Sequence, residues 1–161
     1  MSSQEHKQKI WDLISDIKVA MLVTQGDEEG LHARPMQLVQ DEYDNKIWFY
    51  TNTESEKVFE IESEREVCLT FACPHHETYV SMTGNAKLIK DQALIDKFWS
   101  PFVDAWFPEG KESENVGLIE IKIEKGEHWD SENSKLIQTF KMLKASVTDE
   151  RPDLGENQKF G

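Results

Sequence analysis

The chain of 161 residues has room for one compact domain and little more. Hydrophobic residues make up 38% of it and charged residues 30%, a composition that supplies a core and excludes wholesale disorder. The formal net charge of −13 at pH 7 repels phosphate backbones and anionic lipid surfaces, so neither a nucleic acid nor a membrane is expected as a partner.

The first third of the chain is predicted to form a helix followed by strands. Ile10, Leu13 and Ile14 recur at helical spacing within residues 4–16, which indicates an amphipathic helix. Three runs of apolar and β-branched residues, separated by turn residues, predict strands at 20–24, 31–40 and 46–51. The short connections between these strands favour an antiparallel meander.

The middle of the chain is predicted to contain a short helix and two strands. Thr53 and Glu56 have the spacing of a capping box, which predicts a helix that ends near Ser63. Strands are expected at residues 67–72 and 78–89. Gly84 lies inside the second of these strands and predicts a bulge or bend there.

The last third begins with a predicted helix at residues 91–100 and a loop at 101–115. The loop carries Phe102, Trp106 and Phe107, and such apolar loops often cover a pocket or contact a partner. A sixth strand is expected at residues 117–124, with a continuation toward Trp129.

A final helix is predicted to begin at Ser131, with Leu136, Phe140, Leu143 and Val147 on one face. Residues 148–161 contain few apolar side chains and are expected to form a tail. The sequence therefore predicts one domain over residues 1–147, mainly β with flanking helices, in which six antiparallel strands curl into a small barrel.

The sequence lacks a signal-peptide pattern and a long apolar run, so a cytoplasmic protein is expected. Cys68 and Cys73 are five residues apart, which would direct their thiols to opposite faces of one strand. Neighbouring His75 and His76 diverge on an extended chain, so these four residues do not predict a metal site.

An anion site is the chemistry that residues 32–57 suggest most directly. Arg34 lies within an apolar strand, and a buried guanidinium requires an anionic partner. Lys57 lies in the first turn of the predicted helix, where backbone amides and the helix dipole also favour negative charge. Together with Ser55 these residues could hold one phosphate, whereas the alternative is that Arg34 pairs with a carboxylate of the chain and Lys57 is solvated.

The order and spacing of several short motifs resemble the pyridoxamine 5'-phosphate oxidase family of FMN-binding split barrels, and in particular its bacterial general stress protein subgroup. The motifs are HARPM at 32–36, WFYTN at 48–52, Ser55 with Lys57, VCL at 67–69, YVSMTGNA at 79–86, WFPEG at 106–110 and WD at 129–130. The resemblance covers residues 10–144. It implies a six-stranded antiparallel split β-barrel with Greek-key topology.

The resemblance also implies a cofactor and an assembly. Members of the family are homodimers with FMN at the subunit interface, and an arginine and a lysine that correspond to Arg34 and Lys57 hold the flavin phosphate. The other implied cofactor-binding residues are Pro35, Met36, Tyr50, Thr51, Ser55, Tyr79 and Trp129. Trp129 is expected to approach the ring from the partner subunit.

Two positions depart from the vitamin oxidases of the family. Val39 stands where those enzymes have a lysine that contacts the substrate phosphate, and Glu56 replaces a basic residue just before the helix lysine. These differences argue against pyridoxamine phosphate as the substrate.

The resemblance favours a flavin-dependent oxidoreductase that acts on an unidentified small molecule, in a stress response as the subgroup name suggests. FMN is the expected cofactor, with FAD and haem as alternatives. The flavin would carry the redox chemistry, and no catalytic side chain is identified from the sequence. The alternative is a flavin-binding or sensing module without catalytic activity.

Overall fold

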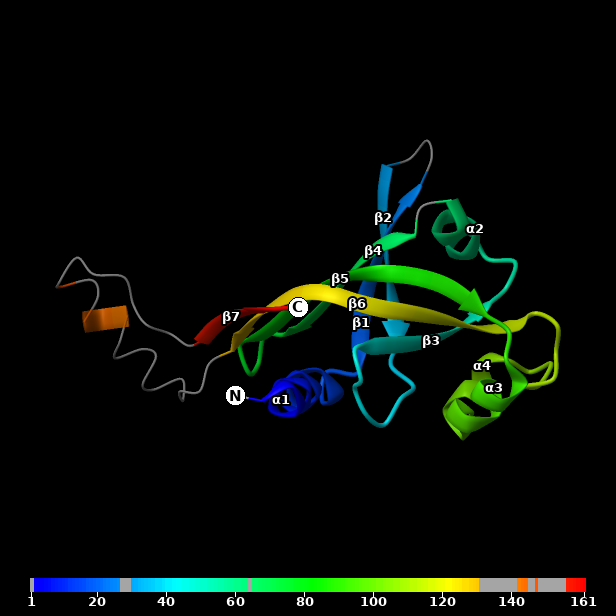
Figure 1. Ribbon diagram of the computed structural model, residues 1–161, viewed down its shortest axis with the longest axis horizontal. Helices are drawn as coiled ribbons and strands as arrows, with labels where there is room; N and C mark the ends of the chain where they lie inside the picture. The colour runs from blue at the N-terminus through cyan, green and yellow to red at the C-terminus, as the bar shows by residue number, and fades with distance from the viewer. Residues whose placement is uncertain (1, 27–29, 64, 131–141, 145–146, 148–155) are drawn as a thin grey trace.

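The computed structural model describes residues 2–26, 30–63, 65–130, 142–144, 147 and 156–161 (Figure 1). Its strands are β1 (Val19–Gly26), β2 (Gly30–Gln37), β3 (Lys46–Asn52), β4 (Glu66–Cys73), β5 (Thr78–Ile89), β6 (Val116–Asp130) and β7 (Glu156–Phe160). Its helices are α1 (Ser3–Ser15), α2 (Glu56–Ser63), α3 (Gln92–Phe98) and α4 (Pro101–Trp106). None of the described helices combines the length and apolarity that are needed to cross a membrane.

All the strand pairs are antiparallel and belong to one sheet. The strand order is β2-β1-β4-β5-β6-β3, and β7 pairs with β6. The predicted class, an antiparallel sheet with flanking helices, is therefore confirmed, although the described residues contain seven strands instead of six.

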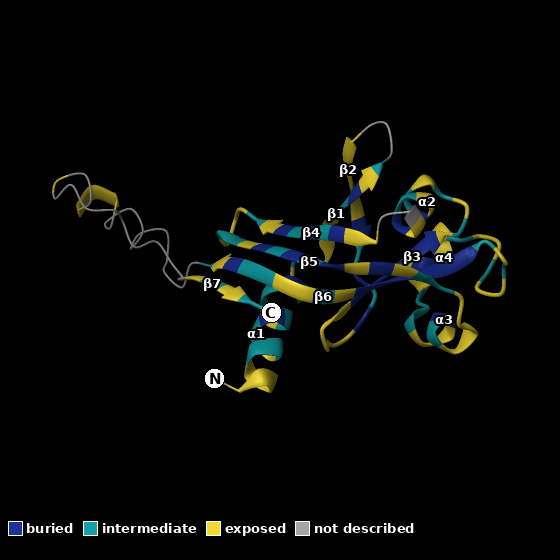
Figure 2. Ribbon diagram, turned by 45° about the horizontal axis from the view of Figure 1, so that its top comes forward, coloured by how far each residue is buried: buried dark blue, intermediate teal, exposed yellow. Residues whose placement is uncertain are grey.

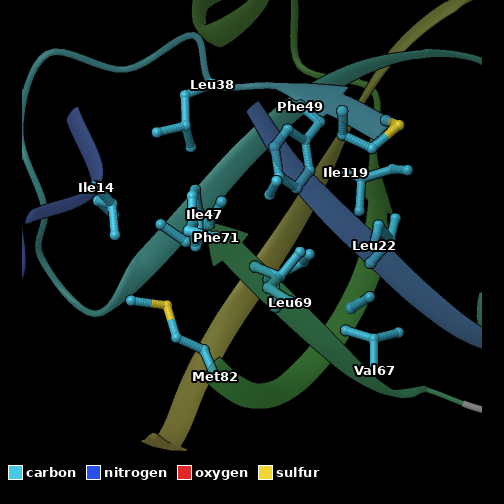
Figure 3. Close-up of a cluster of buried hydrophobic side chains, with 14 of the residues drawn as sticks. Ile14, Leu22, Leu38, Ile47, Phe49, Val67, Leu69, Phe71, Met82 and Ile119 are labelled. Carbon is cyan, nitrogen blue, oxygen red and sulfur yellow. The ribbon is translucent and has the colours of Figure 1, made fainter. Parts of the chain in front are cut away.

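The core forms because alternate side chains of the strands point to the same side. On β4, Val67, Leu69 and Phe71 are buried, whereas the intervening Cys68 and Thr70 are only partly buried. Side chains from β1, β3, β5 and β6 join them, and Ile10 and Ile14 of α1 close one end (Figure 3). Full burial of a large apolar side chain stabilises the fold by about 1.5–3 kcal/mol.

The predicted meander of the first three strands is wrong at the third strand. β3 pairs with the first half of β6 over its whole length, from Lys46 opposite Lys122 to Asn52 opposite Val116. β3 is buried from Ile47 to Thr51 (Figure 2), so it needs cover on both faces. The antiparallel partner β6 and the helices α3 and α4 surround it, a position that a hairpin with β2 would not provide.

Helix α4 corrects the predicted loop at residues 101–115. Ser100 caps this helix through a hydrogen bond from the Val103 N–H to its Oγ, 3.3 Å long, and Pro101 occupies the first turn. Val103 then packs with Trp48, Tyr50, Ile95, Val116 and Leu118 in a second apolar cluster. The predicted bulge is confirmed, since the β5–β6 register shifts between Thr83 and Gly84.

The predicted capping box at Thr53 does not form. The Thr53 hydroxyl donates to the Glu114 carbonyl oxygen instead, and α2 begins at Glu56. The connection between β3 and α2 is shaped by the Asn52 carbonyl, which accepts from the Ser55 N–H at 3.1 Å. Ser55 thereby lies directly before the helix.

The predicted tail is wrong over Glu156–Phe160, because these residues form β7. β7 pairs with β6 from Gly126 opposite Phe160 to Asp130 opposite Glu156. The ring of Phe160 occupies the space that a side chain at position 126 would need. Of the predicted last helix, residues 142–144 and 147 are helical, and 131–141 lie outside the described residues.

Candidate functional site

A cavity of about 510 Å³ opens where the sheet is split. β2 and β3 stand at the two ends of the strand order, so they face each other without forming a ladder. Each contributes three neighbouring residues to the cavity, and α4 covers it. The described lining residues are Val19, Pro35, Met36, Gln37, Val39, Tyr50, Thr51, Asn52, Lys57, Phe102, Val103, Trp106 and Phe107.

The walls of this cavity are mainly apolar and aromatic. Phe102 and Trp106 of α4 are 53% and 70% exposed, so their rings are available to a ligand or to another subunit. Tyr50 offers its ring alone, because its hydroxyl donates to the Ile95 carbonyl oxygen at 2.5 Å. Burial and the nearby charge of Asp96 raise the pKa of Tyr50 well above its usual range, so this phenol stays neutral.

Lys57 is the only charged side chain among the described lining residues. Burial and the charge of Arg34 lower the pKa of its ammonium group. No ion pair of Lys57 is found within the part of the chain that the structure describes. An incompletely solvated cation without a counter-ion favours an anionic ligand.

Polar groups follow β3 toward the start of α2. The Thr51 hydroxyl donates to the Asn52 carbonyl oxygen at 3.1 Å, and the Thr51 and Ser55 hydroxyl oxygens lie 3.2 Å apart. Lys57 belongs to the first turn of α2, where a helix has backbone N–H groups without intrahelical acceptors. This end of the cavity can therefore donate several hydrogen bonds to an anion.

Arg34 is not among the described lining residues of the cavity. Its Nη1 donates to Thr24 Oγ1 at 2.6 Å and its Nη2 to Glu60 Oε2 at 3.0 Å. The Thr24 hydroxyl also donates to Glu60, which closes a three-residue network. The alternative in which Arg34 pairs with a carboxylate is thus realised, and its contact with a phosphate stays a prediction.

The other predicted site residues divide into two groups. Pro35, Met36, Tyr50, Thr51 and Lys57 line the cavity together, and Ser55, which is not among the described lining residues, contacts Thr51 through its hydroxyl group.

Tyr79 and Trp129 are elsewhere. They are cross-strand neighbours near the start of the twelve-residue β5, whereas the cavity lies beside the other end of that strand. Their side chains are 39% and 38% exposed. Their predicted contact with the cofactor is untested within one chain.

Phe102 and Trp106, which the sequence marked as apolar residues that could cover a pocket, lie on α4 in the lining of the cavity. Sequence reasoning missed Glu60, the partner of Arg34. Glu60 could have been found from its position, since it lies three residues after Lys57 on the same helix and so on the same face.

A possible metal-ligand group also includes Glu60. Among the described residues, His32, Glu56 and Glu60 place one ligand atom each within 4.8 Å of one another. The Arg34 guanidinium already binds Glu60, and its positive charge opposes a cation at this position.

The Arg34–Glu60 pair makes a prediction about stability and pH. Burial raises the pKa of Glu60, but the hydrogen bonds from Thr24 and Arg34 and the charges of Arg34 and His32 outweigh it, so the net shift is downward. A carboxyl group whose pKa is lowered by folding stabilises the protein above its unfolded pKa, about 4.3, and loses this effect as the pH falls further. Glu60→Gln is therefore expected to reduce the free energy of unfolding by about 1 kcal/mol at pH 7.

Urea unfolding at pH 7, 5 and 3.5 measures this effect. The difference between wild type and Glu60→Gln should persist at pH 5 and shrink at pH 3.5. Glu62→Gln on the exposed side of α2 removes the same charge and should show no such difference. A gap that widens toward low pH would contradict the argument.

Comparison with known proteins agrees with this architecture. The family model described as "Pyridoxamine 5'-phosphate oxidase like" matches residues 5–153. General stress protein 26 of Bacillus subtilis is 33% identical over 127 residues, which cover 77% of this chain and 88% of that protein. Protein bli-3 of Neurospora crassa is 31% identical over 129 residues, or 72% of this chain, and the chain spans only 62% of that relative.

Solved structures resemble the chain over most of its length. A general-stress-protein-26-like structure from Jannaschia sp. CCS1 superposes with a TM-score of 0.78 at 25% identity and covers 98% of both chains. The general stress FMN/FAD binding protein from Xanthomonas citri superposes with a TM-score of 0.72 at 28% identity, over 82% of this chain and 93% of that one. The chain therefore belongs to the pyridoxamine 5'-phosphate oxidase-like family, and its fold is the split barrel of that family.

Proposed function

We propose that the cavity binds FMN, with the ring system against the aromatic and aliphatic walls and the phosphate toward Lys57. The observation that carries this proposal is the position of Lys57, which has no ion pair among the described residues and is the one charged side chain in the described lining of the cavity. The related protein from Xanthomonas citri is described as FMN/FAD binding, which supports a flavin.

The residues of the cavity fit both parts of this ligand. Its volume of about 510 Å³ falls in the range of cofactor and drug-sized sites, about 300–1,000 Å³. Pro35, Met36 and Tyr50 offer flat or apolar surfaces to a ring system. Lys57 and the first turn of α2 supply ammonium and backbone N–H donors, the groups that hold a phosphate.

The bound flavin would supply hydride or electron transfer, so the chain is proposed to be an oxidoreductase that acts on a small molecule. The chain's own residues would bind and orient the cofactor. Val39 lines the cavity and offers no charge to a substrate phosphate, which favours a substrate other than pyridoxamine phosphate.

A homodimer is part of this proposal. Phe102 and Trp106 remain exposed at the cavity, which suits a site that a second subunit completes. Tyr79 and Trp129 pair at the end of the β5–β6 ladder that is remote from the cavity, which suits contact with the flavin across a subunit interface.

A visible absorption spectrum, recorded before and after dialysis against FMN, tests the proposal together with the mass from size-exclusion chromatography. A flavin spectrum retained on a dimer is the expected result. Absence of flavin uptake, or a haem-like absorption band, would contradict the FMN assignment.

A second function, storage or sensing of flavin without catalysis, is favoured by a specific observation. The described lining residues include no carboxylate, imidazole or thiol that could transfer a proton to a substrate. Turnover of the bound flavin with reduced nicotinamide cofactors and a panel of quinones and aldehydes distinguishes the two functions. Turnover would rule out the purely sensing role.

A further inference from the structure

Two cations, Lys57 and Arg34, and two carboxylates, the paired Glu60 and the exposed Glu56, lie near the polar end of the cavity. Lys57 contributes to the cavity surface, while Arg34 and Glu60 are not among its described lining residues and have side chains 17% and 10% exposed. Thr24, which is 1% exposed, connects Arg34 with Glu60 through its hydroxyl group. The Arg34 charge is therefore largely compensated by a neighbour inside the protein.

The pairing of Arg34 with Glu60 is made by defined hydrogen bonds between side chains that are mostly buried. Arg34 Nη2 donates to Glu60 Oε2 at 3.0 Å, and Nη1 is shared between Thr24 Oγ1 and the Leu22 carbonyl oxygen. Glu60 Oε1 also lies 3.8 Å from Nδ1 of His32, which is on β2, the strand that carries Arg34. Since the network is mostly shielded from water, the charges in it act on a nearby ligand more strongly than exposed charges would.

We propose that Glu60 is the residue that sets the affinity of the cavity for phosphate-bearing ligands, and that it keeps this affinity low. This inference rests on the proposed function. By pairing with Arg34, Glu60 leaves Lys57 as the one lysine or arginine without an ion pair among the described residues of this end, while the charge of the exposed Glu56 is screened by solvent. A phosphate monoester dianion is then held by one uncompensated cation, and FMN acts as an exchangeable ligand instead of a permanently bound group.

The opposite role for Glu60 would be to orient Arg34 toward the phosphate. The two roles predict opposite effects when the carboxylate is replaced by an amide of the same shape. Removal of the carboxylate charge strengthens phosphate binding if Glu60 compensates Arg34, whereas a lost orienting contact weakens it.

The test is a fluorescence titration of wild type, Glu60→Gln and Glu62→Gln with FMN and with riboflavin, which lacks the phosphate. Glu62 is exposed on the same helix, so Glu62→Gln controls for net charge and for the change in α2. Glu60→Gln is expected to bind FMN about tenfold more tightly than Glu62→Gln, an effect of a single charge at close range, with riboflavin binding unchanged. Circular dichroism establishes that each variant is folded.

Equal or weaker FMN binding by Glu60→Gln than by Glu62→Gln would overturn the inference, while FMN binding by the wild type would still support the proposed function. If none of the three proteins binds a flavin, the proposed function fails, and calorimetry with inorganic pyrophosphate then decides the inference. Tighter pyrophosphate binding by Glu60→Gln supports it, and equal or weaker binding contradicts it. If Glu60→Gln does not fold, Glu60→Asp, which shortens the side chain beside Arg34, is expected to act in the same direction with a smaller effect.

Discussion

Replacement of Lys57 by Met is expected to weaken FMN binding by about ten- to a hundredfold, because a charge-assisted contact contributes about 1.5–3 kcal/mol. Met keeps the packing of the aliphatic stem and removes the only charge in the described lining of the cavity. Fluorescence titration with FMN measures the loss.

Folding and binding can be separated in this variant. Burial lowers the pKa of Lys57, so its protonated form is disfavoured in the folded protein and loss of the charge should not reduce stability. Lys122→Ala, an exposed lysine of β6, serves as the control and is expected to bind FMN like the wild type. If Lys57→Met binds FMN as tightly as the wild type, the phosphate of the ligand does not lie at this end of the cavity.

Replacement of Phe49 by Ala should cost about 3–5 kcal/mol of the free energy of unfolding, since it leaves a cavity in the core. Phe49 lies on β3, is fully buried and packs among residues of the main apolar cluster (Figure 3). Because β3 also carries Tyr50 and Thr51 into the lining of the cavity, the same substitution is expected to loosen that site.

Urea unfolding measures this loss, with Phe59→Ala as the matched control. Phe59 is on α2 and is 60% exposed, so its removal should change the free energy of unfolding by less than about 1 kcal/mol. Similar losses for the two variants would contradict the assignment of Phe49 to the core.

The elements that were predicted best are those with a strong local pattern. Alternation along β4 and β5 and the helical spacing of Ile10 and Ile14 depend on neighbouring residues, which a sequence displays directly. The pairing of β3 with β6 could not be read in this way. Its ladder joins residues such as Ile47 and Ile121, which are far apart in the chain, and only closure of the sheet brings them together.

In the candidate site, the two cations were predicted from the sequence, but the partner of Arg34 was not. Arg34 and Lys57 were found because cations in an apolar strand and at a helix start are unusual. The partner of Arg34 was not identified, because Glu60 is one of 31 acidic residues and becomes special only through its position opposite β1 and β2. Likewise, the sequence did not show that the Tyr50 hydroxyl donates to the backbone carbonyl oxygen of Ile95 on α3, which leaves only the ring of Tyr50 for a ligand.

The pairing of β7 with β6 has a consequence for the behaviour of the protein in solution. β3 pairs with β6 over Val116–Lys122, and β7 pairs with it over Gly126–Asp130. Without β7, the second stretch would present a free row of N–H and C=O groups, the kind of edge on which another chain can add a strand. β7 replaces this edge with a strand of only five residues, and very short edge strands are poor templates for another chain, so truncation before β7 is expected to increase self-association.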